Sequence, residues 1–141
     1  MGRGNQAGNV CSKLGIVVGG RVVLMVRDTP AFFYVYLGLM KIGAVPVAIN
    51  LRLSAAEITY TMNDSEAKAI VLDDMFVADY SGVATDVNTN PVVITTDVEH
   101  QNYYYLVKIM EQASPELDAV ELNPQDPALW MYSSGTTGKP K

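Results

Sequence analysis

The segment richest in residues that could do chemistry is 132–141, which reads Tyr-Ser-Ser-Gly-Thr-Thr-Gly-Lys-Pro-Lys. Its two glycines, Gly135 and Gly138, let the backbone turn tightly and approach a ligand closely. Successive backbone amides in such a turn form a concave site for anions. The hydroxyls of Ser133, Ser134, Thr136 and Thr137 add neutral donors, and two lysines add positive charge. These residue types at this spacing predict a loop that binds phosphate groups.

The glycine spacing of this segment differs from that of a Walker A loop, which needs four residues between its glycines and a Ser or Thr after its Lys. Here only Thr136 and Thr137 separate the glycines, and Pro140 follows Lys139. This spacing disfavours a general NTPase. The alternative to a phosphate loop is a surface turn of small polar residues, and the apolar run before the segment favours the phosphate loop.

The elements that must position this loop alternate along the chain between apolar strand-like runs and helix-like segments. This order predicts an α/β fold with a parallel sheet and helices on both faces, and ligands bind such folds at the carboxyl ends of the strands. Residues 6–14 look like the end of a helix, and 114–127 like an exposed connector. The expected strands are 22–26, 45–49, 69–72, 92–95 and 128–132, and the expected helices are 30–42, 55–62, 75–84 and 103–112.

Local signals mark the ends of several of these elements. Thr29 is expected to cap the second helix, and Pro30 suits its first turn. That helix is apolar nearly all round, so we expect it to be buried, with Gly43 ending it in a left-handed turn. Ser54 and Glu57 have the spacing of a capping box. The breaker residues 63–65 should end the third helix.

Composition sets limits on the class of protein. The 141 residues include 49% apolar and 18% charged residues, enough apolar material for a core and some exposed apolar surface. Ten basic and 15 acidic residues give a net charge of −5, which argues against a nucleic-acid or membrane-surface binder. No apolar run reaches the roughly 18 residues of a membrane span. The one cysteine fits a reducing compartment, so a cytoplasmic protein is expected.

Other candidate residues are given structural interpretations. His100, the single histidine, lies in a polar run that favours a surface loop or helix start. Asp73 and Asp74 could bind a metal, but their place before a helix favours capping. The tyrosines at 103–105 fit a partly buried helix face, and Cys11 fits the core. We therefore assign no catalytic residue and no metal ligand within the chain.

The ten-residue segment 132–141 resembles the phosphate-loop signature of the AMP-forming acyl-CoA synthetases, in the adenylate-forming superfamily. The upstream stretches 20–30, 37–50 and 63–68 are also similar to that family, so the resemblance covers nearly the whole chain. Residues 28–30 and 112–130 look most like benzoate- and other aryl-CoA ligases.

The resemblance implies a carboxylate–CoA ligase that joins a carboxylic acid to ATP, giving an acyl-adenylate, and then forms an acyl-CoA. Its substrates would be a small carboxylate, ATP and coenzyme A, with Mg²⁺ accompanying the triphosphate. The residues that correspond to the phosphate-contacting set are Ser133, Ser134, Gly135, Thr136, Thr137, Gly138 and Lys139.

The resemblance also implies that residues 1–141 are a partial large amino-terminal domain, which binds nucleotide and acyl groups. The acyl pocket, the carboxyl-terminal domain and its adenylation lysine would lie outside the chain, so Lys139 and Lys141 are not that lysine. We expect the chain alone to be inactive, and to self-associate through an unpaired sheet edge and uncovered apolar surface. The alternative is a ligase-like module that binds a partner or phosphate without turnover.

Overall fold

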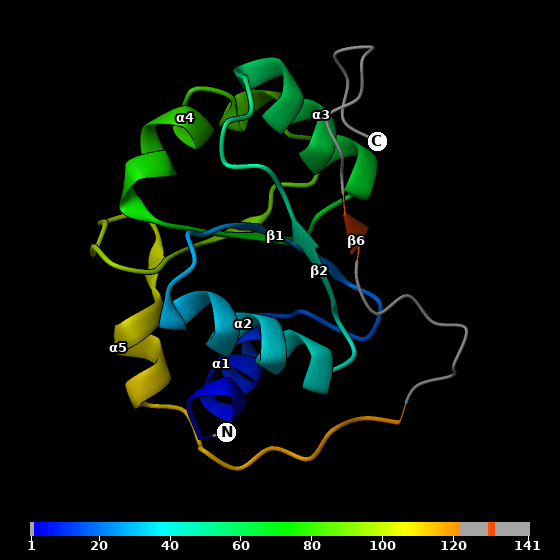
Figure 1. Ribbon diagram of the computed structural model, residues 1–141, viewed down its shortest axis with the longest axis vertical. Coiled ribbons are helices and arrows are strands. Elements are labelled where there is room, and N and C mark those ends of the chain that lie inside the picture. The colour runs from blue at the N-terminus through cyan, green and yellow to red at the C-terminus, as the bar shows by residue number, and fades with distance from the viewer. Residues whose placement is uncertain (1, 122–129, 132–141) are drawn as a thin grey trace.

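A six-stranded parallel sheet with helices on both faces forms the body of the protein (Figure 1). The computed structural model describes residues 2–121 and 130–131. The strand order is β5-β4-β3-β1-β2-β6, and every neighbouring pair is parallel, which confirms the predicted α/β class. The elements are α1 (Gly2–Lys13), β1 (Arg21–Met25), α2 (Pro30–Lys41), β2 (Val45–Ala48), α3 (Ala55–Ser65), β3 (Ala69–Leu72), η1 (Asp74–Phe76), α4 (Val77–Ser81), η2 (Ala84–Asp86), β4 (Val92–Thr95), β5 (Tyr104–Tyr105), α5 (Leu106–Glu111) and β6 (Trp130–Met131).

Two apolar cores lie on opposite faces of this sheet. In β1, Val22 and Leu24 face one core, whereas Val23 and Met25 face the other, because side chains alternate along a strand. Helices α1, α2 and α5 cover the first face, and α3 and α4 cover the second (Figure 1). Nearly all of the β1 and β3 side chains are buried, as expected for central strands of a parallel sheet.

Helices α1 and α2 approach each other at three glycines. A Cβ atom added to Gly38 would lie 2.4 Å from the backbone nitrogen of Gly8 and 2.6 Å from the carbonyl oxygen of Gly4. Both neighbours are backbone atoms, which cannot move aside as a flexible side chain can. The contact therefore requires glycine at position 38.

Several local predictions are confirmed. The Ser54 hydroxyl accepts a hydrogen bond from the Glu57 amide at 3.2 Å, and the Glu57 side chain accepts one in return, which completes the capping box. Gly43 has a φ of 78°, the left-handed conformation predicted at the end of α2. Cys11 is 1% exposed, as expected of a core residue.

Helix α3 runs through the predicted breaker and ends at Ser65, with Glu66 in the left-handed conformation. Distant bonds explain the extra turn. The Asn63 side chain donates to the carbonyl of Asp86 and accepts from the amide of Asn88, at 3.0 and 2.8 Å. These bonds to a segment more than 20 residues away let Asn63 stay helical, so the prediction of a break was wrong.

Helix α2 departs from two predictions. It was expected to be buried all round, but Phe33 is 57% exposed, and Leu37 and Met40 are each 38% exposed. These three residues form an outward stripe, because they are spaced by four and three positions. Thr29 does occupy the N-cap position, but its side chain makes no capping hydrogen bond.

The two helices predicted at 75–84 and 103–112 are shorter than expected. The first region is divided among η1, α4 and η2. In the second, Tyr104 and Tyr105 form strand β5 beside Ile94 and Thr95 of β4, so α5 begins only at Leu106. The interpretation of the tyrosines as a helix face was therefore wrong, because the backbone of Tyr104 and Tyr105 pairs with strand β4 instead of forming helical hydrogen bonds.

The connector predicted at 114–127 is described as far as residue 121. It is mostly exposed there, as expected, with Leu117 half-buried. Residues 122–127 lie outside the described part of the chain. In residues 2–121 and 130–131, no helix combines the length and apolar character needed to cross a membrane.

Candidate functional site at the carboxyl edge of the sheet

Strand β6 brings the chain to the carboxyl edge of the sheet just before the glycine-rich segment. Trp130 pairs with Val47, and Met131 with Ala48, so β6 runs parallel to β2. The described strand lies within the predicted range 128–132. The residues predicted to contact phosphate, Ser133, Ser134, Gly135, Thr136, Thr137, Gly138 and Lys139, lie outside the described residues.

An ion pair joins the carboxyl ends of β1 and β3 at this edge. The Asp73 carboxylate oxygen Oδ2 accepts from the Arg27 backbone amide at 3.0 Å and from Arg27 Nε at 2.7 Å. Asp73 is buried, with a side chain 2% exposed, whereas the Arg27 side chain is 49% exposed. Because β1 and β3 are neighbours, residues that follow each strand directly lie side by side at the edge.

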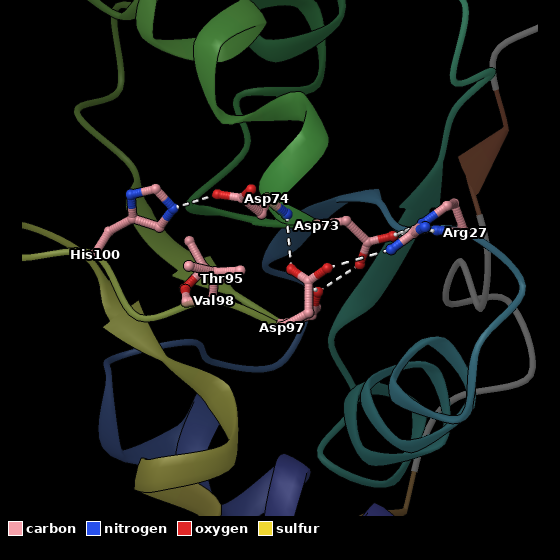
Figure 2. A network of polar contacts seen from close by, with 8 residues as sticks. Arg27, Asp73, Asp74, Thr95, Asp97, Val98 and His100 are labelled. Atoms are coloured by element: carbon pink, nitrogen blue, oxygen red, sulfur yellow. Dashed lines mark hydrogen bonds and ion pairs between the residues drawn. The ribbon is translucent and has the colours of Figure 1, made fainter.

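This ion pair belongs to a longer polar network (Figure 2). The Thr96 hydroxyl donates to Asp73 Oδ1, and Arg27 Nη2 donates to Asp97 Oδ2 at 3.2 Å. Asp97 Oδ1 accepts from the Asp74 backbone amide at 2.7 Å, and Asp74 Oδ1 lies 2.7 Å from His100 Nε2. The network therefore connects the segments that follow β1, β3 and β4.

The electrostatics of the ion pair favour its charged form. Burial would raise the pKa of Asp73, but hydrogen bonds from Arg27 and Thr96 outweigh burial and hold the pKa below its ordinary value. The same hydrogen bond from Arg27 to Asp73 raises the pKa of Arg27. Asp73 therefore stays ionised in the folded protein across the neutral range.

These contacts correct one prediction. Asp73 sits at the N-cap position of η1 but makes no capping bond, because Arg27 and Thr96 occupy its carboxylate. His100 lies in a loop, as predicted, and its ring nitrogen Nε2 lies 2.7 Å from Asp74 Oδ1. Among the described residues, no group of three or more His, Cys, Asp or Glu side chains could hold a metal ion.

Chemically, the network holds these segments in a fixed arrangement. Asp73 accepts three hydrogen bonds, from the Arg27 backbone amide, from Arg27 Nε and from the Thr96 hydroxyl. Sequence reasoning missed its link with Arg27. Each residue directly follows a predicted strand, and that signal would have paired them had the neighbouring positions of β1 and β3 been known.

Comparison with known proteins places the chain in a family. Residues 3–141 match the family described as AMP-binding enzyme. The chain is 33% identical over 139 residues to the 3-hydroxybenzoate–CoA/4-hydroxybenzoate–CoA ligase of Thauera aromatica, covering 97% of this chain and 27% of that ligase. It is 34% identical over 137 residues to the 3-hydroxybenzoate–CoA ligase of Aromatoleum sp. (strain CIB), covering 97% of this chain and 26% of that ligase.

Solved structures agree. The anthranilate CoA ligase AuaEII, in complex with anthranoyl-AMP, matches with a TM-score of 0.95 and 26% identity, covering 99% of this chain and 27% of that one. The N-terminal domain of FACL13 from Mycobacterium tuberculosis matches with a TM-score of 0.87 and 30% identity, covering 99% of this chain and 34% of that one. The chain thus spans about a quarter of the length of its curated relatives, and it belongs to the AMP-binding enzyme family.

Proposed function

We propose that this chain contributes the phosphate-binding segment of an ATP-dependent carboxylate–CoA ligase, which forms an acyl-adenylate and then an acyl-CoA. The observation that carries the proposal is the parallel pairing of β6 with β2, which brings Met131 to the carboxyl edge two residues before Ser133. Ligands of open parallel sheets bind at this edge. The family match through residue 141 supports the same role.

Within the segment, we assign phosphate contacts to Ser133, Ser134, Gly135, Thr136, Thr137, Gly138 and Lys139. Hydroxyls and backbone amides would hold the β- and γ-phosphates of ATP while a carboxylate oxygen attacks the α-phosphorus, with pyrophosphate leaving. Their contribution is to position the reactants and to supply fixed donors where negative charge develops.

Mg²⁺ would accompany the triphosphate, but the described residues provide no cluster of ligands for it. We propose that residues 1–141 form part of the amino-terminal domain of a larger enzyme. The relatives that cover this chain are about four times its length, which supports that division. The single cysteine supports a cytoplasmic setting.

The proposed substrate is an aryl carboxylic acid. Relatives named as ligases for hydroxybenzoates and benzoate, and a solved anthranilate ligase, support this choice. Relatives named as fatty-acid ligases also match, so the test must include aliphatic acids. A longer enzyme that contains this chain should release AMP with ATP, CoA and benzoate or a hydroxybenzoate, faster than with hexanoate or palmitate.

Lys139→Ala and Gly135→Val in the longer enzyme test the role of the segment. Removing the lysine charge or crowding the turn should reduce kcat by about a hundredfold to a thousandfold, the scale of losing one fixed donor. Lys68→Ala, an exposed lysine remote from the segment in sequence, is the matched control and should stay near wild type. Unchanged kinetics in both segment variants would overturn the assignment.

The 141-residue chain by itself is proposed to be catalytically inactive, and acyl-CoA formation above background would contradict this. The alternative is a ligase-like module that binds phosphate or a partner without turnover. It would be favoured if the longer enzyme bound ATP but released no AMP with any acid.

Self-association of the 141-residue chain is also proposed. The stripe of Phe33, Leu37 and Met40 on α2 supports self-association, because contact between two copies would bury these exposed apolar side chains. Light scattering should show dimers or larger species, and Phe33→Glu should shift them toward monomer. A monomer at high protein concentration would contradict the proposal.

A further inference from the structure

A cavity of about 500 Å³ lies between α1 and α5, beside β5. Its volume falls within the range of about 300–1,000 Å³ that is typical of small-molecule sites. Its walls come from α1, from Tyr104 of β5, and from the end of α5 with the residues that follow it. The lining residues are Asn9, Val10, Lys13, Leu14, Tyr104, Ile109, Gln112, Ala113 and Ser114.

Side-chain amides of α1 hold one wall of this cavity in place. Gln6 Nε2 donates to the Ala113 carbonyl at 3.2 Å, and Asn9 Nδ2 donates to the Ser114 carbonyl at 2.8 Å. Asn5 Nδ2 donates to the carbonyl of Pro115 at 2.8 Å, one residue further on. These bonds join segments more than 100 residues apart, so the wall is built by the fold.

The lining combines apolar side chains with one charge. Val10, Leu14, Ile109 and Ala113 supply the apolar part. Lys13 is the single charged residue in the lining, and its ammonium group makes no hydrogen bond or ion pair with the other described residues. The partial negative charge at the carboxyl end of α1 disfavours an anion, so the preference for an anion depends on the Lys13 ammonium group alone.

We propose that this cavity binds a small monocarboxylate with an apolar body, whose carboxylate pairs with Lys13 and whose body contacts Val10, Leu14, Ile109 and Ala113. Apolar surface would supply most of the affinity, and the ammonium group would supply the preference for an anion.

This site is separate from the glycine-rich segment proposed to bind phosphate. The cavity lies beside β5, whereas the glycine-rich segment follows β6, and β5 and β6 are the two outermost strands of the sheet. Five strand spacings of about 4.8 Å place β5 and β6 roughly 24 Å apart. The inference does not rest on the proposed ligase activity, and its test needs neither ATP nor turnover.

The test is an NMR titration of the folded 141-residue chain with two probes that have the same chain length, octanoate and octanol. Octanoate should cause saturable shifts in the amides of Val10, Leu14, Ile109 and Ala113. Octanol should bind about threefold to fivefold more weakly, as expected for one partly exposed charge pair.

Three variants separate the charge from the apolar walls. Lys13→Gln should bring octanoate affinity down to that of octanol. Lys68→Gln removes another exposed lysine outside the cavity and should leave the difference intact. Ala113→Phe should fill the cavity and weaken both probes, and its thermal unfolding curve verifies that the variant is folded.

Three outcomes would each overturn the proposal. They are the absence of saturable shifts at millimolar octanoate, equal binding of octanoate and octanol by the wild-type chain, and shifts centred on the exposed stripe of α2 in place of the cavity. An equal effect of Lys68→Gln and Lys13→Gln would also contradict it, because it would mean that net charge alone drives binding.

Discussion

The contact between α1 and α2 and the polar network at the carboxyl edge are held by different physical means. At the first, Gly8 and Gly38 bring two backbones so close that a carbon added at either position would collide with backbone atoms of the other helix. At the second, Arg27 and Asp73 are joined by charge and hydrogen bonds, with half of the arginine side chain exposed.

The difference teaches where each region is sensitive. The glycine contact depends on volume, so pH should leave it unaffected while the smallest side chain disrupts it. The network depends on ionisation, so it should respond to acid. Four substitutions test whether shape and charge divide between the two regions in this way.

The largest effect is expected from Gly38→Ala. Its Cβ would lie under 3 Å from backbone atoms of α1, so the helices must separate, at a cost of about 3 kcal/mol in the free energy of unfolding. Urea unfolding measures the change. Gly82→Ala is the matched control, because its Cβ would meet its nearest neighbour at 3.5 Å, an ordinary contact. If Gly38→Ala lowered the free energy of unfolding no more than the control, the α1–α2 contact would not depend on the volume of the side chain.

Asp73→Asn should cost about 2 kcal/mol at pH 7, the scale of losing hydrogen bonds to a charged group. The pKa of Asp73 is lowered by folding, so its stabilisation is present above its unfolded pKa near 4 and is lost as pH falls through the folded pKa. The difference between wild type and variant, followed by unfolding from pH 7 to pH 2, should therefore shrink in acid.

Asp79→Asn provides the control for this acid series. Asp79 is an exposed carboxylate on α4, outside the network, and its removal should change stability little at any pH. If the difference in free energy of unfolding between wild type and Asp73→Asn did not change with pH, the aspartate would act by its shape and not by its charge.

The third substitution, Cys11→Ala, concerns the buried core that α1 helps to form. Burial raises the pKa of Cys11 from 9.0 to about 12. As pH rises above 9, the unfolded chain loses the thiol proton while the folded chain keeps it, so stability falls. The loss should reach about 1 kcal/mol at pH 10. Unfolding at pH 8 and pH 10 should show this extra loss in wild type but not in Cys11→Ala.

The smallest effect is expected from Arg27→Lys. The variant keeps the positive charge but loses the paired geometry with Asp73 and Asp97, because lysine lacks the planar guanidinium group. The free energy of unfolding, measured in urea, should fall less than in Asp73→Asn, because the positive charge is kept. A loss as large as that of Asp73→Asn would show that direction, more than charge, holds the network.

Much of the fold was predictable because its signals are local. The strands expected at 22–26, 69–72 and 92–95 were found within one residue, since each is a run of apolar, mostly β-branched residues bounded by polar ones. The capping box at Ser54 needs only four consecutive residues.

The features that escaped prediction depend on contacts between distant segments. Strand β5 has two residues and exists because β4 lies beside it, and the pairing of Arg27 with Asp73 depends on the strand order. The phosphate loop was predicted from residue types and spacing, and its residue assignments stay a prediction.

The placement of β6 has a consequence for the order in which the protein assembles during synthesis. Strand β1 is flanked by β2 and β3, all contained in residues 21–72, so a growing chain can complete this centre of the sheet early. Strand β6 must instead return from residue 130 to pair with Val47 and Ala48. Until the ribosome has delivered that late stretch, the outer side of β2 stays without its neighbour, open to any other extended peptide that a chaperone would have to keep away.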